Sequence, residues 1–444
     1  MVYCSTKWLP NGPFIVPKTA FYGDKTALKR TKMNLYEAIS MSKRTGIYIH
    51  IPFCISKCAY CDFYSLPAGE GLMKRYHQAL TRQLVEAAPS LDRYYVDSIY
   101  FGGGTPSYYG AARIVDLFNT LKDHYKVLLD AEVTMEVNPD SISDKDLRIL
   151  RKAGVNRLSI GVQTADDALA KNLGRRHTFQ HVTRVMERAR KVGFQNISLD
   201  LIYGLPSQSK ADWADTLNQI IALRPDHISC YGLRIEEGTP LHVFRDSPLI
   251  PSEDDQADMY LFMVEALKDV GYRQYEVSNF ALPDRESRHN LKYWNREEYA
   301  GFGPSAHSYI GDIRYSYIKG IDEYLDALEG NGALLASRDE IPSSEQSVEY
   351  LMLGLRTTKG ITGDEYHAIY QSSFAPIEAL LFDYEKQGWA HRLNGRWSLT
   401  PQGFLLSNQL IRAILDARTE ERITVGMPWK RSEHTAYIAQ AGQK

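Results

Sequence analysis

Six short β-rich runs, separated by segments of helical periodicity, constrain the fold of this chain more than any other feature of its sequence. The runs cover residues 46–51, 97–103, 132–139, 157–163, 197–206 and 226–233. In one intervening segment Ser143 can cap a helix, Leu147 and Leu150 share a face, and Gly154 can end it. This alternation predicts an α/β fold with a parallel sheet and right-handed crossovers. It leaves open whether the six units form a doubly wound sheet or an incomplete barrel.

Unusual side chains lie in or directly after five of these runs. Three cysteines follow the first run, and three glycines lie at the end of the second and directly after it. Glu136 and Gln163 stand near the ends of the third and fourth, and Asp200 lies in the fifth. Ligands collect at the carboxyl ends of parallel strands. We therefore predict one shared site at that edge of the sheet.

The most specific motif is the loop that carries Cys54, Cys58 and Cys61 in a C-x₃-C-x₂-C spacing. Cubane iron–sulfur clusters are bound by thiolates, usually one per iron. Three cysteines therefore predict a [4Fe–4S] cluster whose fourth iron can bind a small molecule such as S-adenosylmethionine (SAM). A zinc site completed by His50 or Asp62 is the alternative, but no second ligand pair is visible.

The glycine run at residues 101–107 follows the second strand, and its lack of Cβ atoms lets the backbone approach a ligand closely. We expect its backbone groups and Thr105 to bind the amino and carboxylate groups of SAM, although a tight strand-to-helix turn would have the same sequence. Hydrogen bonds to the ribose, methionine and adenine parts are expected from Glu136, Gln163, Arg175 and Asp200. Each of these four could instead be an ordinary packed or solvated polar residue.

Composition excludes several classes of function. The five cysteines among 444 residues do not make a disulfide framework, and clustered thiols point to metal or redox chemistry in a reducing cytoplasm. The net charge of −2 gives no reason to expect a nucleic-acid partner. The chain has no run of about 18 apolar residues, so we expect no integral membrane segment.

The chain divides into four predicted regions. Residues 1–45 are basic and acid-poor, and we interpret them as a disordered extension or a mis-assigned start. Residues 46–335 form the barrel, residues 340–416 a helical, winged-helix-like domain, and residues 417–444 a loosely ordered tail, with a break near 332–346. The C-terminal domain has six Lys/Arg against eight Asp/Glu over residues 341–416, which disfavours DNA binding.

Taken in order, the motifs HIPFC-x₃-C-x-YCDFYS, FGGGTPS, EVNPD, SIGVQ, LGRRH, DLIYGLP and HN-x₂-YW resemble those of the HemN-like radical SAM family. The resemblance covers about residues 46–415. It implies a partial (β/α)6 barrel with a helical C-terminal domain, and cluster ligation by Cys54, Cys58 and Cys61. It further implies SAM contacts from a set of matching positions, namely Tyr48, Tyr60, Gly103, Gly104, Thr105, Glu136, Gln163, Arg175 and Asp200.

Two branches of this family differ near the cluster. Oxygen-independent coproporphyrinogen III oxidases have a further cysteine two places after the third ligand, where this chain has Phe63. The heme chaperone branch resembles this sequence more closely, both in the CDF ending and in the motif within segment 275–310. By resemblance that motif binds heme, through residues His289, Asn290, Tyr293 and Trp294.

The resemblance thus implies a protein that binds heme and delivers it to heme-accepting respiratory proteins, with a reductant protein serving the cluster. A histidine can bind heme iron, and aromatic rings suit a flat macrocycle. His289 could equally be an ordinary loop histidine among core aromatics. An oxidase that decarboxylates coproporphyrinogen III to protoporphyrinogen IX remains the main alternative, with a heme-modifying methyltransferase behind it. The heme recipient, the electron donor, SAM turnover and the oligomeric state do not follow from the sequence.

Overall fold

The computed structural model describes residues 43–330 and 332–424. Most of the predicted N-terminal extension, residues 1–42, lies outside the described residues. Its last two residues do not belong to an extension, because Arg44 and Thr45 open the first strand. The described residues from Arg44 onward form one compact unit.

All six predicted runs are β-strands, and helices separate them. The strands are β1 (Arg44–Ile51), β2 (Tyr95–Gly103), β3 (Lys126–Val137), β4 (Arg157–Gln163), β5 (Ile197–Tyr203) and β6 (His227–Gly232). The helices are α2 (Glu70–Ala87), η1 (Ala88–Leu91), α3 (Pro106–Tyr109), α4 (Ala111–His124), α5 (Asp144–Ala153), α6 (Asp167–Asn172), α7 (Phe179–Lys191), α8 (Lys210–Ala222), η2 (Pro240–Phe244) and α9 (Glu253–Asp269).

The predicted boundaries of α5 are confirmed in detail. Ser143 accepts a hydrogen bond from the Asp146 amide, and the Asp146 side chain returns one to the Ser143 amide. Gly154 ends the helix in the left-handed conformation, with φ of 117°, which glycine adopts without steric cost. These local signals fix the element before any packing is considered.

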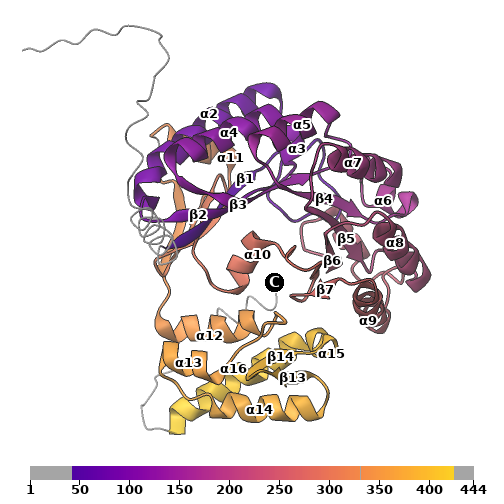
Figure 1. Ribbon diagram of the computed structural model, residues 1–444, viewed down its shortest axis with the longest axis vertical. Coiled ribbons are helices and arrows are strands. Elements are labelled where there is room, and N and C mark those ends of the chain that lie inside the picture. Colours follow the sequence, from indigo (N-terminus) through magenta and orange to yellow (C-terminus); the bar gives the residue numbers. More distant parts are fainter. Residues whose placement is uncertain (1–42, 331, 425–444) are drawn as a thin grey trace, which may run out of the picture. The chain divides into compact units, whose positions relative to one another are not determined.

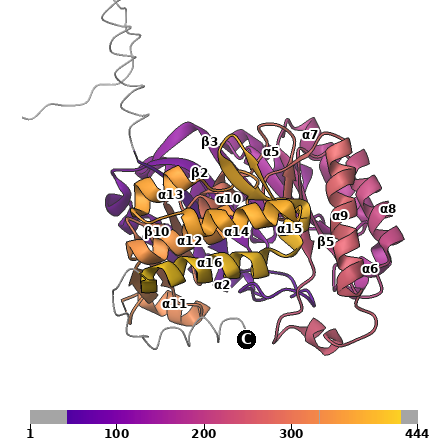
Figure 2. The same ribbon diagram turned by 90° about the horizontal axis from the view of Figure 1, so that it is seen from below.

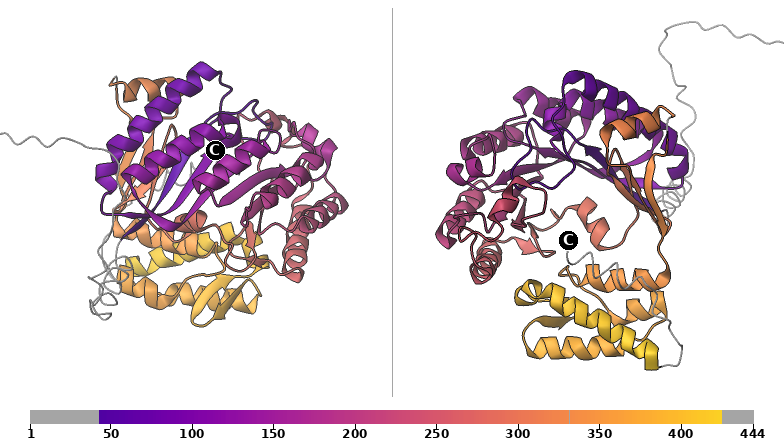
Figure 3. Two further views of the ribbon diagram at one scale, coloured as in Figure 1. Left: turned by 45° about the horizontal axis from the view of Figure 1, so that its top comes forward. Right: turned by 180° about the vertical axis from the view of Figure 1, so that it is seen from behind.

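Strand order decides between the two architectures that the sequence leaves open. Strands β1 to β6 are parallel and lie side by side in chain order. Every crossover therefore runs in the same direction, and right-handed crossovers place all the connecting helices on one face. Figure 1 and Figure 3 show these helices on the convex side of a curved sheet, and none of them on its concave side. The fold is an incomplete barrel, not a doubly wound sheet.

Side-chain alternation in β1 shows how the two faces of the sheet differ. Ile47, Ile49 and Ile51 are fully buried in the main hydrophobic core. Tyr48 points the other way, where its ring lies 6.1 Å from that of Tyr100 and 6.4 Å from that of His289. The concave face is therefore polar and aromatic, which suits a binding site better than a core.

Residues 270–340 extend the sheet at both edges. They form β7 (Arg273–Gln274), β8 (Asn279–Ala281), α10 (Arg288–Trp294), β9 (Tyr299–Phe302), β10 (His307–Ile310), β11 (Ile313–Tyr317), α11 (Ile321–Leu328) and β12 (Leu335–Glu340). The full sheet has the order β12-β11-β10-β9-β1-β2-β3-β4-β5-β6-β8-β7. The break predicted near 332–346 is wrong, because β12 pairs with β11 as the outermost strand. All six of its side chains are exposed, so it lacks the apolar pattern of the other strands.

The C-terminal module consists of α12 (Ser343–Gly354), α13 (Gly363–Tyr370), α14 (Ala375–Lys386), β13 (Ala390–Leu393), β14 (Arg396–Leu399), α15 (Pro401–Leu405) and α16 (Ser407–Thr424). The predicted hairpin turns at Asn394 and Gly395, both with positive φ. The tail predicted from residue 417 begins too early, because α16 continues to Thr424. Residues 425–444 lie outside the described residues.

The module is attached to the barrel beside β8. The Val277 amide donates to the Arg356 carbonyl at 3.1 Å, and the Thr358 amide donates to the Tyr275 carbonyl at 3.1 Å. Glu349 adds ion pairs to Arg296 and Arg314. Seen from below, helices α12, α14 and α16 lie in front of the barrel strands (Figure 2).

Candidate functional site

A cavity of about 1150 Å³ lies at the carboxyl ends of the barrel strands. Its walls come from the cysteine loop, the glycine run, the ends of β3 to β6, helix α10 and the C-terminal module. Pockets for a single drug-sized ligand usually measure about 300–1,000 Å³. This cavity therefore has room for more than one small group.

Backbone hydrogen bonds hold the cysteine loop against three other segments. The Cys54 amide donates to the Leu66 carbonyl at 3.1 Å, and the Ala59 amide to the Leu173 carbonyl at 3.0 Å. The Ala59 carbonyl in turn accepts from the Leu241 amide at 2.9 Å. Because the backbone is anchored in this way, the thiols need no packing role, and all three cysteines line the cavity half-buried.

The thiols have chemically suitable neighbours. The Sγ of Cys54 lies 3.2 Å from the Thr105 hydroxyl, and Arg175 Nη1 donates to Cys58 Sγ at 3.6 Å. Burial raises the pKa of both Cys54 and Cys61. Binding a metal centre here would therefore displace protons from the thiols.

The three thiols do not converge on one point. Among residues 43–330 and 332–424, no three His, Cys, Asp or Glu side chains form a group that could hold a single metal ion. A cubane cluster does not need such convergence, because each thiolate binds a different iron. Three thiols on one loop, free of other structural duties, fit such a cluster, whose binding here stays a prediction.

The glycine run has a different role from the one expected of its amides. The Gly103 amide donates to Glu136, the Gly104 amide to the Ile51 carbonyl at 2.8 Å, and the Thr105 amide to the Phe53 carbonyl at 2.8 Å. A Cβ on Gly104 would lie 2.8 Å from the Phe53 carbonyl oxygen. The run thus packs against the strand that leads into the cysteine loop, and these amides have no capacity left for a ligand carboxylate.

Glu136 lies half-buried near this run, in the wall of the cavity. One of its carboxyl oxygens accepts from the Tyr100 hydroxyl at 3.0 Å and the other from the Gly103 amide at 3.0 Å. Burial raises the pKa of Glu136 to about 7, and the two hydrogen bonds offset only part of that effect. The side chain can therefore lose or gain a proton near neutral pH.

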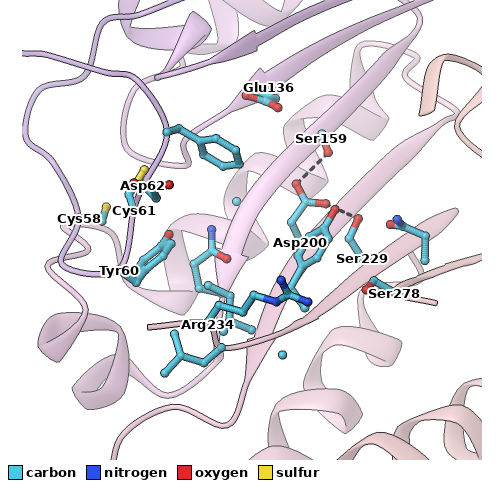
Figure 4. Close-up of a pocket in the computed structure, with 18 of the residues that line it drawn as sticks. Cys58, Tyr60, Cys61, Asp62, Glu136, Ser159, Asp200, Ser229, Arg234 and Ser278 are labelled. Carbon is cyan, nitrogen blue, oxygen red and sulfur yellow. Dashed lines mark hydrogen bonds between the residues drawn. The ribbon is translucent and has the colours of Figure 1, made fainter. Parts of the chain in front are cut away.

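Asp200 is the centre of a hydroxyl network in the barrel. It accepts hydrogen bonds from Ser159 at 2.8 Å, Ser198 at 3.0 Å and Ser229 at 2.8 Å. Figure 4 shows Asp200 between Ser159 and Ser229, with the cysteines on another side of the pocket. Gln163, at the end of β4, has φ of 72°, a conformation uncommon for a residue with a side chain and frequent at functional sites.

Arg175 joins the cysteine loop to the strand ends. Besides Cys58, its guanidinium donates to the Asn138 side chain at 2.5 Å and to the Gly161 carbonyl at 2.6 Å. Tyr60 lies beside it in the cavity wall, in contact with a small apolar cluster that includes Leu173. Both residues therefore stand where the sequence analysis predicts ligand contacts.

Two of the predicted residues do not line the cavity. The Tyr48 hydroxyl lies 3.0 Å from His50 Nδ1, and neither residue lines the cavity. His289 is 1% exposed, with Nδ1 3.0 Å from the Ser98 hydroxyl and Nε2 2.8 Å from the Tyr293 hydroxyl. Burial lowers the pKa of His289 to about 3, so its ring is neutral. In this conformation neither ring nitrogen can reach an iron in the cavity.

The rest of the α10 motif does face the cavity. Asn290, Tyr293 and Trp294 line it, and Figure 1 shows α10 within the open side of the sheet. The helix is held by Lys292, which is 2% exposed and forms ion pairs with Asp97 at 2.9 Å and Glu297 at 3.1 Å. His289 thus positions Tyr293. Asn290, Tyr293 and Trp294 line the same cavity as the three cysteines.

Several cavity residues have no signal in the sequence. Arg157 opens β4 and is 1% exposed, yet its Nε and Nη1 have no hydrogen-bond partner. Arg234 and Arg356 come from a loop and from the C-terminal module. Glu276 is also buried in the wall, which raises its pKa to about 7. Arg157 begins the run 157–163 and Glu276 lies in segment 275–310, but nothing in the sequence marks any of the four as a site residue, and only the folded chain brings them together.

Comparisons with known proteins agree with this architecture. The radical SAM superfamily model matches residues 48–220, and the HemN C-terminal domain model matches residues 341–406. Among solved structures, coproporphyrinogen III oxidase (HemN) from Escherichia coli is similar with a TM-score of 0.73 and 24% identity, over 88% of this chain and 93% of that one. At that identity the likeness establishes the fold.

Curated relatives are closer in sequence. The chain is 36% identical over 372 residues to the heme chaperone HemW of Bacillus subtilis (strain 168), which spans 83% of this chain and 98% of the relative. The HemW of Lactococcus lactis is 34% identical over 379 residues, 84% of this chain and 98% of that protein. The mitochondrial radical S-adenosyl methionine domain-containing protein 1 of Bos taurus is 36% identical over 72% of this chain and 75% of that protein. Within the described ranges, no helix is both long enough and apolar enough to cross a membrane.

Proposed function

Because this chain belongs to the HemW family of radical SAM proteins, we propose that it binds heme and passes it to heme-requiring proteins, with a [4Fe–4S] cluster and SAM bound beside the heme site. One observation carries the proposal. The cysteine loop and the Asn290-Tyr293-Trp294 face of α10 line the same cavity, so both ligands can be held in one space. We expect this to occur in the cytoplasm, with a reductant protein supplying electrons to the cluster.

In this proposal Cys54, Cys58 and Cys61 hold the cluster. When bound, the cluster and SAM supply one-electron reductive chemistry at a sulfonium. Arg175 offers positive charge beside Cys58 and donates a hydrogen bond to its sulfur. The SAM site comprises Tyr60, Gly103, Gly104, Thr105, Glu136, Gln163, Arg175 and Asp200, and Tyr48 supports it from behind through His50.

The chain's own groups suggest how SAM would be oriented. The amides of residues 103–105 are occupied, so the strand-end carbonyls are the backbone groups left for the ligand's ammonium. Glu136 can accept from an ammonium group when ionised and donate when protonated. Asp200 and its three hydroxyl donors give a preorganised acceptor, which suits a ribose hydroxyl.

The heme would rest against Tyr293 and Trp294, because broad aromatic faces suit a flat apolar macrocycle. His289 orients Tyr293 and does not act as an axial ligand in the conformation described. Phe63, 71% exposed, occupies the place of the additional cysteine found in the oxidase branch. This substitution supports the chaperone over the coproporphyrinogen III oxidase.

The test begins with anaerobic reconstitution of the full chain with iron and sulfide, followed by parallel assays. We expect saturable heme binding in a Soret titration and no decarboxylation of coproporphyrinogen III in the presence of SAM and reductant. Trp294→Ala should weaken heme binding by about tenfold, because a large apolar contact is lost. As a matched control, Tyr299→Phe alters a ring that packs on Tyr293 from outside the cavity, and it should retain binding. Stoichiometric protoporphyrinogen formation would overturn the proposal in favour of the oxidase.

A further inference from the structure

We propose that the part of the cavity between β6 and the C-terminal module recognises carboxylate groups of its ligand, and that Arg234 and Arg356 are the partners of those carboxylates. This rests on the proposed function in one respect, because a heme ligand would present its two propionates there. The two arginines would supply polar recognition, which the aromatic residues of α10 do not provide.

Arg356 is held in place by its surroundings but lacks a counter-ion. Its carbonyl accepts from the Val277 amide, and its Nη2 donates to Asn408 Oδ1 at 2.8 Å. Its Nε is buried with no hydrogen-bond partner. Buried guanidinium nitrogens are normally paired, and Arg356 also lines the cavity, so a carboxylate bound beside it would supply the counter-ion that this residue lacks.

Arg234 supplies a second positive charge in the same cavity. It follows β6, and within the described part of the chain its side chain makes no hydrogen bond or ion pair. Its charge is felt at Arg356, where it joins burial in lowering the pKa of that guanidinium. Figure 4 shows the Arg234 side chain extended along the pocket toward the side of Ser278, away from Cys58 and Cys61.

Three other arginines near the module are paired with carboxylates. Arg296 and Arg314 share Glu349, and Arg396 pairs with Glu365. Arg234 and Arg356 have no such carboxylate among the described residues, although like charges repel at close range. A bound dianion would remove this repulsion and could accept paired hydrogen bonds from each guanidinium.

The neighbouring side chains argue for an organic carboxylate over a free inorganic anion. Leu353, Phe404 and Leu405 of the C-terminal module line the same cavity, and Leu405 is 40% exposed. An apolar wall beside two cations suits a ligand with a broad hydrophobic body and acidic edges. The C-terminal module would thereby contribute directly to ligand selection.

The first test compares two ligands, beginning with the wild-type protein. The reconstituted full-length protein is titrated with iron protoporphyrin IX and with its dimethyl ester, which keeps the macrocycle but lacks the carboxylates. We expect the ester to bind at least tenfold more weakly.

Arg234→Gln and Arg356→Gln should each weaken binding of the free acid by about tenfold and leave ester binding unchanged. Arg273→Gln, an exposed arginine on β7 outside the cavity, should change neither.

A SAM titration of the same variants separates the two carboxylate-bearing ligands. Unchanged SAM affinity is expected, and a selective loss of SAM binding would overturn the assignment to the macrocycle. Equal affinity for acid and ester in the wild-type protein would overturn the carboxylate proposal while leaving heme binding intact. Failure of the wild-type protein to bind either porphyrin would instead contradict the proposed function.

Discussion

The cysteine loop and helix α10 meet the same cavity but are built in opposite ways. Residues 54–61 have no helix or strand, and the loop is anchored through its backbone while its side chains stay half-buried or exposed. In α10 the side chains anchor the element, because Ser287, His289 and Lys292 are almost completely buried and hydrogen-bonded or ion-paired. A segment anchored by its backbone keeps its side chains available for a ligand, whereas a segment anchored by side chains offers only the face that remains.

The largest expected effect is on metal content, and it tests the role of the cysteine loop. Cys58→Ala should reduce the iron and sulfide retained after reconstitution to near zero, because one of three ligands is lost. The free energy of unfolding of the apo protein should hardly change, since Cys58 is not part of the core. Iron and sulfide analysis with urea unfolding measures both. Cys230→Ala, at a buried position in β6, should keep its metal content. Full metal content in Cys58→Ala would break the comparison.

The second prediction concerns stability. Lys292→Met leaves Asp97 buried without its counter-ion, which should lower the free energy of unfolding by about 3–5 kcal/mol. Lys57→Met in the exposed cysteine loop should change it by about 0.5 kcal/mol or less. Urea unfolding of the apo proteins compares the two directly. Equal effects from both substitutions would mean that α10 is no more dependent on its side chains than the loop is.

A smaller, pH-dependent effect comes from Glu136, which lines the same cavity as the two regions. Its pKa is raised from 4.5 to about 7 in the folded protein, so the folded state binds a proton more tightly than the unfolded state. The resulting stabilisation is complete below about pH 4.5 and is lost as pH rises through about 7, by about 3 kcal/mol in total. Glu136→Gln should flatten this part of the pH profile of unfolding.

The matched control for that profile is Glu187→Gln, on the exposed face of α7. It should reproduce the wild-type pH dependence. Part of the wild-type slope should persist in Glu136→Gln, because burial also raises the pKa of Glu276 to about 7. A Glu136→Gln profile as steep as that of the wild type would show that the carboxyl titrates normally in the fold.

Much of the barrel could be predicted because its signals are local. The apolar runs of β1 to β6 and the Ser143 and Gly154 caps of α5 depend on short-range sterics and hydrogen bonds. Strand β12 was missed for the opposite reason. Its residues are all exposed, and only pairing with β11 at the sheet edge makes it a strand.

The candidate site was predictable to a similar degree. Residues at strand ends meet because parallel strands share an edge, which is why Cys58, Glu136 and Asp200 line one cavity. The roles of individual groups were harder to predict from the sequence. The glycine run was expected to bind SAM through its backbone groups, and His289 to belong to a heme-binding motif. The amides of residues 103–105 and both ring nitrogens of His289 have partners within the protein.

The sequence by itself determined the alternation of strands and helices, the three-cysteine loop and the family to which the chain belongs. Those features depend on residue type and spacing, which folding does not alter. Only the tertiary structure decided which donors remain open and which cations lack a partner, as with Arg234 and Arg356. A hydrogen bond or an ion pair belongs to two segments at once, and their meeting depends on how the whole chain packs.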